Sequence, residues 1–127
     1  MNKKMLTIEY PIRNASISVL WNSVGTALGL SEWFADVVTV AGNEYTFAWD
    51  DNEQTAILID KKPNSFIRFQ WAEDMNATAF FEIKISKEAI TRGITLVVTD
   101  FANPDEMDDL KLLWDKQINE LKRKIGI

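Results

Sequence analysis

NPDEMDDLKLLWDKQINELKRKIGI, residues 103–127, is the stretch of sequence that decides the fold. Asn103 can cap a helix N-terminus, Pro104 suits the first helical position because its missing N–H needs no partner there, and Glu106 follows three residues after the cap. Beyond them, apolar residues recur at steps of three and four and so share one helical face. They are Met107, Leu110, Trp114, Ile118, Leu121 and Ile125, with Leu113 widening the face. An amphipathic helix of this length needs a large apolar surface, which the rest of the chain must supply.

The charges of this stretch match the helix dipole. Acidic residues crowd the first turn, basic residues crowd the last, and Gly126 can end the helix. The acidic residues are Asp105, Glu106, Asp108 and Asp109, and the basic ones are Lys122, Arg123 and Lys124. We interpret the acidic group as helix stabilisation rather than a metal or partner site, and the basic residues as an ordinary solvated face.

Upstream, the chain begins with a strand and two short helices. Residues 3–12 alternate between apolar and polar side chains, which predicts a half-buried strand. Ser16 can cap a helix that runs to Val24, and a second short helix is expected from Thr26 to Ala35.

After Asp36 the apolar period changes to two, and turn-forming residues separate six further strands. Their expected ranges are Val37–Val40, Glu44–Asp50, Glu53–Asp60, Ser65–Trp71, Ala77–Ser86 and Ile90–Phe101, with Gly93 marking a bulge or a shifted turn. This order predicts one α+β domain spanning residues 1–127, in which a seven-stranded antiparallel sheet curves around the C-terminal helix. The two short helices lie between strands 1 and 2 of this helix-grip arrangement.

Composition excludes several classes of function. The 127 residues include no Cys and no His, which excludes thiol and Ser-His-Asp catalysis and the usual zinc ligands. We therefore expect no cofactor and no metal. A net charge of −5 with scattered Lys and Arg argues against nucleic-acid binding. The longest uncharged run, Asn14–Ser31, is too polar for membrane insertion, and no signal peptide is visible, so a cytoplasmic location is expected.

Several motifs carry a resemblance to a known family. SISVLW (residues 16–21) and GLSEWFAD (residues 29–36) resemble the N-terminal pattern of the START-like superfamily, also called SRPBCC or birch-pollen-allergen-like. The branch is similar to the C-terminal domain of the heat-shock-protein-90 ATPase activator. IRFQW (67–71), TDFA (99–102) and LW (113–114) are similar to a small START-like group of Bacteroidetes.

This resemblance implies a helix-grip sheet with an apolar cavity between sheet and helix. Members of the family bind lipids, sterols, polyketides or plant hormones, and the activator branch contacts a chaperone. The resemblance supplies no catalytic residue that maps onto a position of this chain.

The candidate ligand site is the set of aromatic and apolar residues that the alternation places toward the helix. We expect a cavity lined by Trp33, Phe47, Trp49, Phe69, Trp71, Phe81, Ile83, Asp100, Met107, Leu110 and Trp114. The alternative is a packed core without a void, because a chain with five Trp and seven Phe can fill its own interior.

Asp100 is the polar member of this set. It continues the apolar face of Ile94, Leu96 and Val98, so its carboxylate could orient a ligand or act as a general base. The simpler interpretation places Asp100 at the end of its strand, capping or exposed.

These observations favour non-catalytic binding of a small hydrophobic ligand, lipid-like or polycyclic, between the sheet and the C-terminal helix. The alternative is a protein-interaction module with a filled core that forms a homodimer or binds a chaperone-type partner. An enzyme that uses carboxylates or Tyr as acid and base is the third interpretation, and it lacks a convincing pair of groups.

Overall fold

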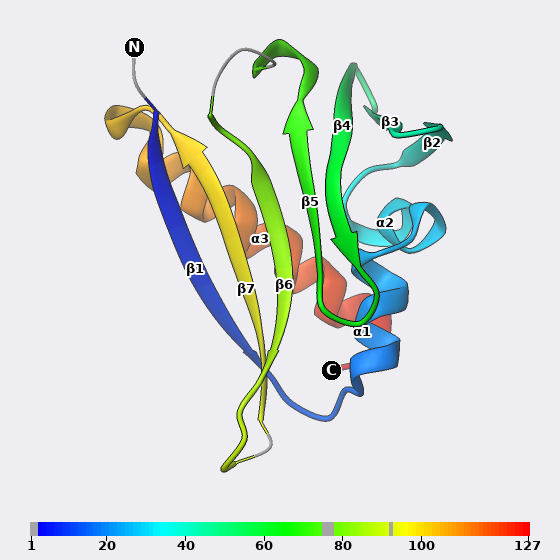
Figure 1. The fold of residues 1–127 in the computed structure, drawn as a ribbon, viewed down its shortest axis with the longest axis vertical. Coiled ribbons are helices and arrows are strands. Elements are labelled where there is room, and N and C mark those ends of the chain that lie inside the picture. The colour runs from blue at the N-terminus through cyan, green and yellow to red at the C-terminus, as the bar shows by residue number, and fades with distance from the viewer. Residues whose placement is uncertain (1–2, 75–77, 92) are drawn as a thin grey trace.

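The computed structural model describes residues 3–74, 78–91 and 93–127. The strands are β1 (Lys4–Ile12), β2 (Val37–Ala41), β3 (Glu44–Trp49), β4 (Asn52–Lys62), β5 (Phe66–Trp71), β6 (Phe81–Lys87) and β7 (Ile94–Ala102) (Figure 1). The helices are α1 (Ile17–Val24), α2 (Ala27–Trp33) and α3 (Met107–Ile125), with short 3-10 turns η1 (Ala72–Asp74) and η2 (Pro104–Glu106).

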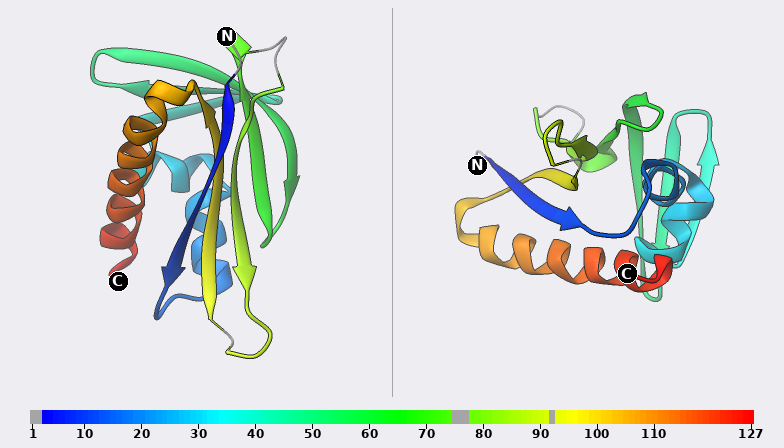
Figure 2. Two further views of the ribbon diagram at one scale, coloured as in Figure 1. Left: turned by 90° about the vertical axis from the view of Figure 1, so that its left-hand side faces the viewer. Right: turned by 90° about the horizontal axis from the view of Figure 1, so that it is seen from below.

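The seven strands form one antiparallel sheet in the order β1-β7-β6-β5-β4-β3-β2. Each strand from β2 to β6 therefore pairs with the next strand along the chain. β1 pairs with β7 and forms the edge of the sheet opposite β2. The sheet curves around α3, and α1 and α2 lie beside the C-terminal end of that helix (Figure 2). This arrangement confirms the predicted helix grip.

The α1–α2 hairpin is built by local caps and one close contact. Ser16 Oγ accepts a hydrogen bond from Val19 N at 3.2 Å, and Thr26 Oγ1 accepts one from Gly29 N at 3.0 Å, so both helices begin with a side-chain cap. A Cβ at Gly29 would collide with the backbone of Asn22 in α1. The glycine therefore allows the two helices to pack tightly together.

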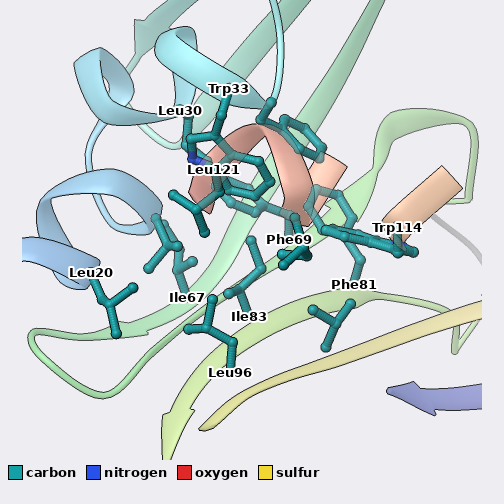
Figure 3. Close-up of a cluster of buried hydrophobic side chains, with 14 of the residues drawn as sticks. Leu20, Leu30, Trp33, Ile67, Phe69, Phe81, Ile83, Leu96, Trp114 and Leu121 are labelled. Atoms are coloured by element: carbon teal, nitrogen blue, oxygen red, sulfur yellow. The ribbon is translucent and has the colours of Figure 1, made fainter. Parts of the chain in front are cut away.

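The core lies between the inner face of the sheet and the two helical layers. The predicted alternation is confirmed, because the inward residues of β3, β5 and β6 are buried, apart from Trp49 and Trp71, which are half-buried. Phe69 forms an edge-to-face contact with Phe47, with ring centroids 5.7 Å apart, and stacks on Phe81 at 5.1 Å. Figure 3 shows Phe69, Phe81 and Ile83 packed together beneath α3. This central part of the interior is filled by side chains.

The start of α3 differs from the prediction. Asn103 precedes the 3-10 turn η2 rather than the α-helix, and its side chain does not cap the turn. Instead its amide Nδ2 donates to the Glu106 carboxylate at 2.8 Å, while Glu106 N donates to Asn103 O at 2.8 Å. Leu113 does not widen the buried face fully, because 51% of it remains exposed.

Two strands begin several residues later than predicted. β7 begins at Ile94 rather than Ile90, which is 95% exposed in a loop closed by a hydrogen bond from Glu88 N to Gly93 O at 2.8 Å. Gly93 lies in the loop immediately before β7, in agreement with the shifted turn rather than the bulge. Within the described strands, a register shift lies between Leu58 and Asp60 of β4. The strand predicted to begin at Ala77 begins at Phe81, and its predicted first residue lies outside the described residues.

Candidate functional site

A pocket of about 370 Å³ opens between the sheet and the first half of α3. Most of its wall is apolar, and a smaller polar group lies among the apolar side chains. The apolar lining residues are Phe34, Trp49, Trp71, Leu110, Leu113 and Trp114. The polar lining residues are Asn52, Gln54, Asp100 and Gln117.

Phe34, which follows α2, joins two tryptophans of the wall. Its ring centroid lies 5.9 Å from that of Trp49 at the end of β3 and 5.8 Å from that of Trp114 on α3. The backbone carbonyl of Phe34 also accepts a hydrogen bond from Trp49 Nε1 at 2.9 Å. These contacts fix the orientation of both indole rings.

The third tryptophan rests on the packed core. Trp71, at the end of β5, stacks on Phe81 with ring centroids 4.8 Å apart, and Trp114 lies 6.2 Å from the same ring. In Figure 3 the ring of Trp114 lies beside Phe81. The filled core therefore supports the aromatic walls of the pocket.

Asp100 comes from the inner face of β7, two residues after buried Val98. Its Oδ2 accepts a hydrogen bond from Trp114 Nε1 at 2.8 Å, and its Oδ1 accepts one from Phe101 N at 2.7 Å. Burial raises the pKa of this carboxyl, and the two N–H donors oppose part of that rise. Asp100 therefore lies near the end of β7, as the simpler interpretation expected, but its carboxyl lines the pocket instead of being fully exposed.

The structure divides the sequence-predicted site residues between the pocket and other places. Five of them line the pocket, namely Trp49, Trp71, Asp100, Leu110 and Trp114. Four lie in the packed core beneath it, namely Phe47, Phe69, Phe81 and Ile83. Trp33 is buried and donates its indole N–H to Ser23 O at 2.8 Å, while Met107 is half-buried at the start of α3. That any of these residues binds a ligand stays a prediction.

Five lining residues were not in the predicted set, although periodicity places most of them there. Gln117 follows Leu110 and Leu113 at helical spacing, so all three share one face of α3. Asn52 and Gln54 lie four and two residues before buried Ala56 in β4. Every second side chain of a strand points to the same face, so both point to the inner face of the sheet. The predicted set was chosen mainly for apolar side chains, so these polar residues were left out.

The titratable chemistry of the pocket lining rests on one carboxyl group. Among the described lining residues, Asp100 is the sole group with a formal charge, so it has no second titratable group there to form an acid–base pair. Across the part of the chain that the structure describes, no cluster of three His, Cys, Asp or Glu residues could hold a metal ion. No helix among the described residues is long and apolar enough to cross a membrane.

Comparison with known proteins agrees with this architecture. The model of the START-like superfamily domain matches residues 1–127. A Bacteroides fragilis protein of known solution structure is 39% identical over 100% of this chain and 94% of its own, with a TM-score of 0.70. No curated protein matches the chain.

More distant structures share the fold alone. The Aha1 dimer from Colwellia psychrerythraea is 16% identical, covers 98% of this chain and 97% of its own, and has a TM-score of 0.79. ChR145 from Cytophaga hutchinsonii is 14% identical over 98% of this chain and 96% of its own, with a TM-score of 0.72. These matches confirm the resemblance carried by the sequence motifs, and the chain belongs to the START-like superfamily.

Proposed function

We propose that this protein binds one small hydrophobic ligand, lipid-like or polycyclic, in the pocket between the sheet and α3, and that it does so without catalysing a reaction. The observation that carries the proposal is the pocket of about 370 Å³ whose wall includes three tryptophans. The START-like fold typically binds hydrophobic ligands, which supports the same assignment.

The size and the rigidity of the pocket suit a compact ligand. Small-molecule sites usually measure about 300–1,000 Å³, and this pocket lies near the lower end of that range. Burying apolar ligand surface contributes about 25 cal/mol per Å². Because hydrogen bonds and ring contacts already hold Trp49 and Trp114, little side-chain entropy is lost when a ligand enters.

A second candidate function is protein interaction through the edge of the sheet. β2 is an edge strand, and its Val37 and Val40 remain largely exposed. An exposed apolar edge can pair with a strand of another chain, either a second copy or a chaperone-type partner. The Colwellia psychrerythraea relative of this fold was solved as a dimer.

Native mass spectrometry of the purified protein, beside its denatured mass and a lipid extract, is the first test. An extra mass that is lost on denaturation and recovered as one hydrophobic compound supports ligand binding. A stable apo dimer without a bound compound favours the interaction module instead.

Titration with prodan, a neutral fluorescent naphthalene, tests the pocket itself through two matched variants. Leu110→Trp places a large side chain at the pocket wall, whereas Leu112→Trp places the same side chain on the exposed face of α3, where Leu112 is 66% exposed. We expect Leu110→Trp to weaken prodan binding at least about tenfold through steric exclusion, and Leu112→Trp to leave it unchanged. Equal binding by both variants would place the probe elsewhere and contradict the proposal.

A further inference from the structure

The polar chemistry of the pocket narrows the class of ligand, and this inference rests on the proposed function. Two tryptophans of the wall use their N–H groups within the protein: Trp49 Nε1 donates to Phe34 O and Trp114 Nε1 donates to Asp100 Oδ2. What remains for a ligand is indole ring surface. Trp114 is only 3% exposed, so most of this surface comes from Trp49 and Trp71, which are half-buried. Such surfaces attract positive charge as well as apolar groups.

Asp100 adds a carboxyl group that takes part in none of the ion pairs formed between described residues. Its two hydrogen-bond donors are the neutral indole of Trp114 and the neutral backbone amide of Phe101. The charge of Lys3 lowers the pKa of Asp100, and the charge of Asp74 raises it. Lys3 and Asp74 also form an ion pair with each other at 3.0 Å. Burial disfavours the ionised form of Asp100, so a positive group within the pocket would stabilise that form.

The surroundings of the pocket opening are acidic on two sides. The β3–β4 hairpin, which carries Asp50, Asp51 and Glu53, reaches over the start of α3 (Figure 2). The start of α3 carries Asp108 and Asp109 in its first turn. The first half of this helix also carries Lys116 and Lys111, and Lys111 forms an ion pair with Asp115 at 3.0 Å. Acidic groups on both sides raise the local concentration of cations and repel anions.

We propose that the ligand is an organic cation, an amine or quaternary ammonium on an apolar or aromatic body, whose positive centre lies against the tryptophan rings beside the Asp100 carboxylate. The apolar body occupies the space next to Leu110 and Leu113. An aromatic wall binds the apolar body of a neutral ligand as well as that of a cationic ligand. A preference for positive charge is therefore what distinguishes this inference from the proposed binding of any small hydrophobic ligand.

Three probes of nearly equal shape test this preference. Benzyltrimethylammonium carries a permanent positive charge, neopentylbenzene replaces its nitrogen by carbon, and phenylmethanesulfonate carries a negative charge. Binding is followed through the indole N–H signals in 15N-edited NMR spectra, in which Trp114→Phe identifies the Trp114 signal. We expect the cation to bind about tenfold more tightly than its carbon isostere, and the anion to bind most weakly.

Two charge-removing variants locate the effect. Asp100→Asn keeps the size of the side chain and an acceptor for Trp114 Nε1, and it should remove most of the preference for the cation while neutral binding persists. Asp60→Asn removes one negative charge from an exposed position of β4 outside the pocket lining and should leave the preference intact.

Each outcome decides between the two proposals. Equal affinities for the cation and its carbon isostere overturn the cation inference and leave hydrophobic binding standing. A cation preference that survives Asp100→Asn also overturns it, because the charge would then be recognised elsewhere. If none of the three probes shifts the indole signals at millimolar concentration, both the cation inference and the proposed function fail.

Discussion

The two halves of α3 face the same sheet but meet different surroundings. In the second half, Ile118 and Leu121 are fully buried, and α2 packs against the helix. In the first half, Leu110 is half-buried and Leu113 is 51% exposed beside the pocket. We call the region around Ile118 and Leu121 the closed end, and the region around Leu110 and Leu113 the open end.

The difference shows what determines the free volume inside this grip. Apolar residues follow the same spacing along both halves of the helix, so the pattern alone does not create the pocket. At the closed end the α1–α2 hairpin fills the space between helix and sheet. At the open end large aromatic rings, held by the core and by hydrogen bonds, line a space that they do not fill. We infer that the volume of the pocket is limited by how far the hairpin reaches along α3.

The largest expected effect comes from comparing one substitution at the two ends. Leu121→Ala removes a fully buried side chain and leaves a void, so it should lower the free energy of unfolding by about 3 kcal/mol. Leu113→Ala removes a largely exposed side chain and should cost less than about 1 kcal/mol. Urea denaturation of both variants measures the difference. Losses of similar size would show that the two ends pack equally well.

The second prediction concerns the hairpin that fills the closed end. Gly29→Ala would place a methyl group against the backbone of Asn22, so α1 and α2 must separate, at a cost of about 2 kcal/mol. Gly93→Ala in the exposed β6–β7 loop is the matched control, because its new methyl group meets only the Thr91 hydroxyl. Thermal unfolding compares the two variants. A harmless Gly29→Ala would mean that close packing of the hairpin does not support the closed end.

Sequence periodicity was sufficient to predict the fold. The alternation of period two placed every inward aromatic residue of β3 and β5 on the correct face, and Ser16 and Thr26 marked the starts of the short helices. The chief boundary error, at the start of β7, arose because Ile90 fits an apolar alternation although it lies in an exposed loop. Alternation indicates which residues lie on the same face of a strand, but it does not indicate where the pairing between strands begins or ends.

The candidate site was less predictable because a void depends on how side chains pack. Phe47 and Trp49 lie on the same face of β3, yet Phe47 lies in the packed core and Trp49 lines the pocket. The two residues lie at different positions relative to α2 and α3. The spacing of residues in the sequence does not reveal this difference. Asn52 and Gln54 were missed for another reason, because Asp100 was the sole polar residue considered for the wall.

A smaller effect is expected at the boundary between the two ends. Tyr10 of β1 donates its hydroxyl to Asp115 Oδ1 at 2.6 Å, and this contact fixes the sheet edge to α3 next to Trp114. Tyr10→Phe should lower the free energy of unfolding by about 1 kcal/mol, measured by urea denaturation. Hydrogen bonds from Tyr10 and Lys111 lower the pKa of Asp115, so this stabilisation is present above the ordinary carboxyl pKa and is lost as the pH falls through the lowered value.

A double-mutant cycle separates this contact from the loss of either side chain alone. If the hydrogen bond carries the effect, Tyr10→Phe should cost little once Asp115→Ala is present. An unchanged cost in that background would assign the loss to packing of the ring rather than to the bond. The position of α3 over the open end would then depend on the core and not on its link to β1.

The smallest effect concerns Asp100 at the open end, and its sign is opposite. Because burial raises the pKa of this carboxyl in the folded protein, the unfolded chain releases the proton at lower pH, near the ordinary value of about 3.9. The folded state therefore holds more protons between the two pKa values, and stability falls as the pH rises through that window. Asp100→Asn cannot ionise and keeps an acceptor for Trp114 Nε1, so it should avoid this loss.

The variant should match the wild type in stability below the ordinary carboxyl pKa and exceed it at neutral pH, by less than the Tyr10→Phe loss. Urea denaturation at a series of pH values measures this difference, and Asp60→Asn controls for the general effect of removing one acidic residue. A wild type that gains stability over Asp100→Asn as the pH rises would show that Lys3 and the two N–H donors outweigh burial. The open end would then hold its carboxylate ionised without help, and a cationic ligand would have less to stabilise there.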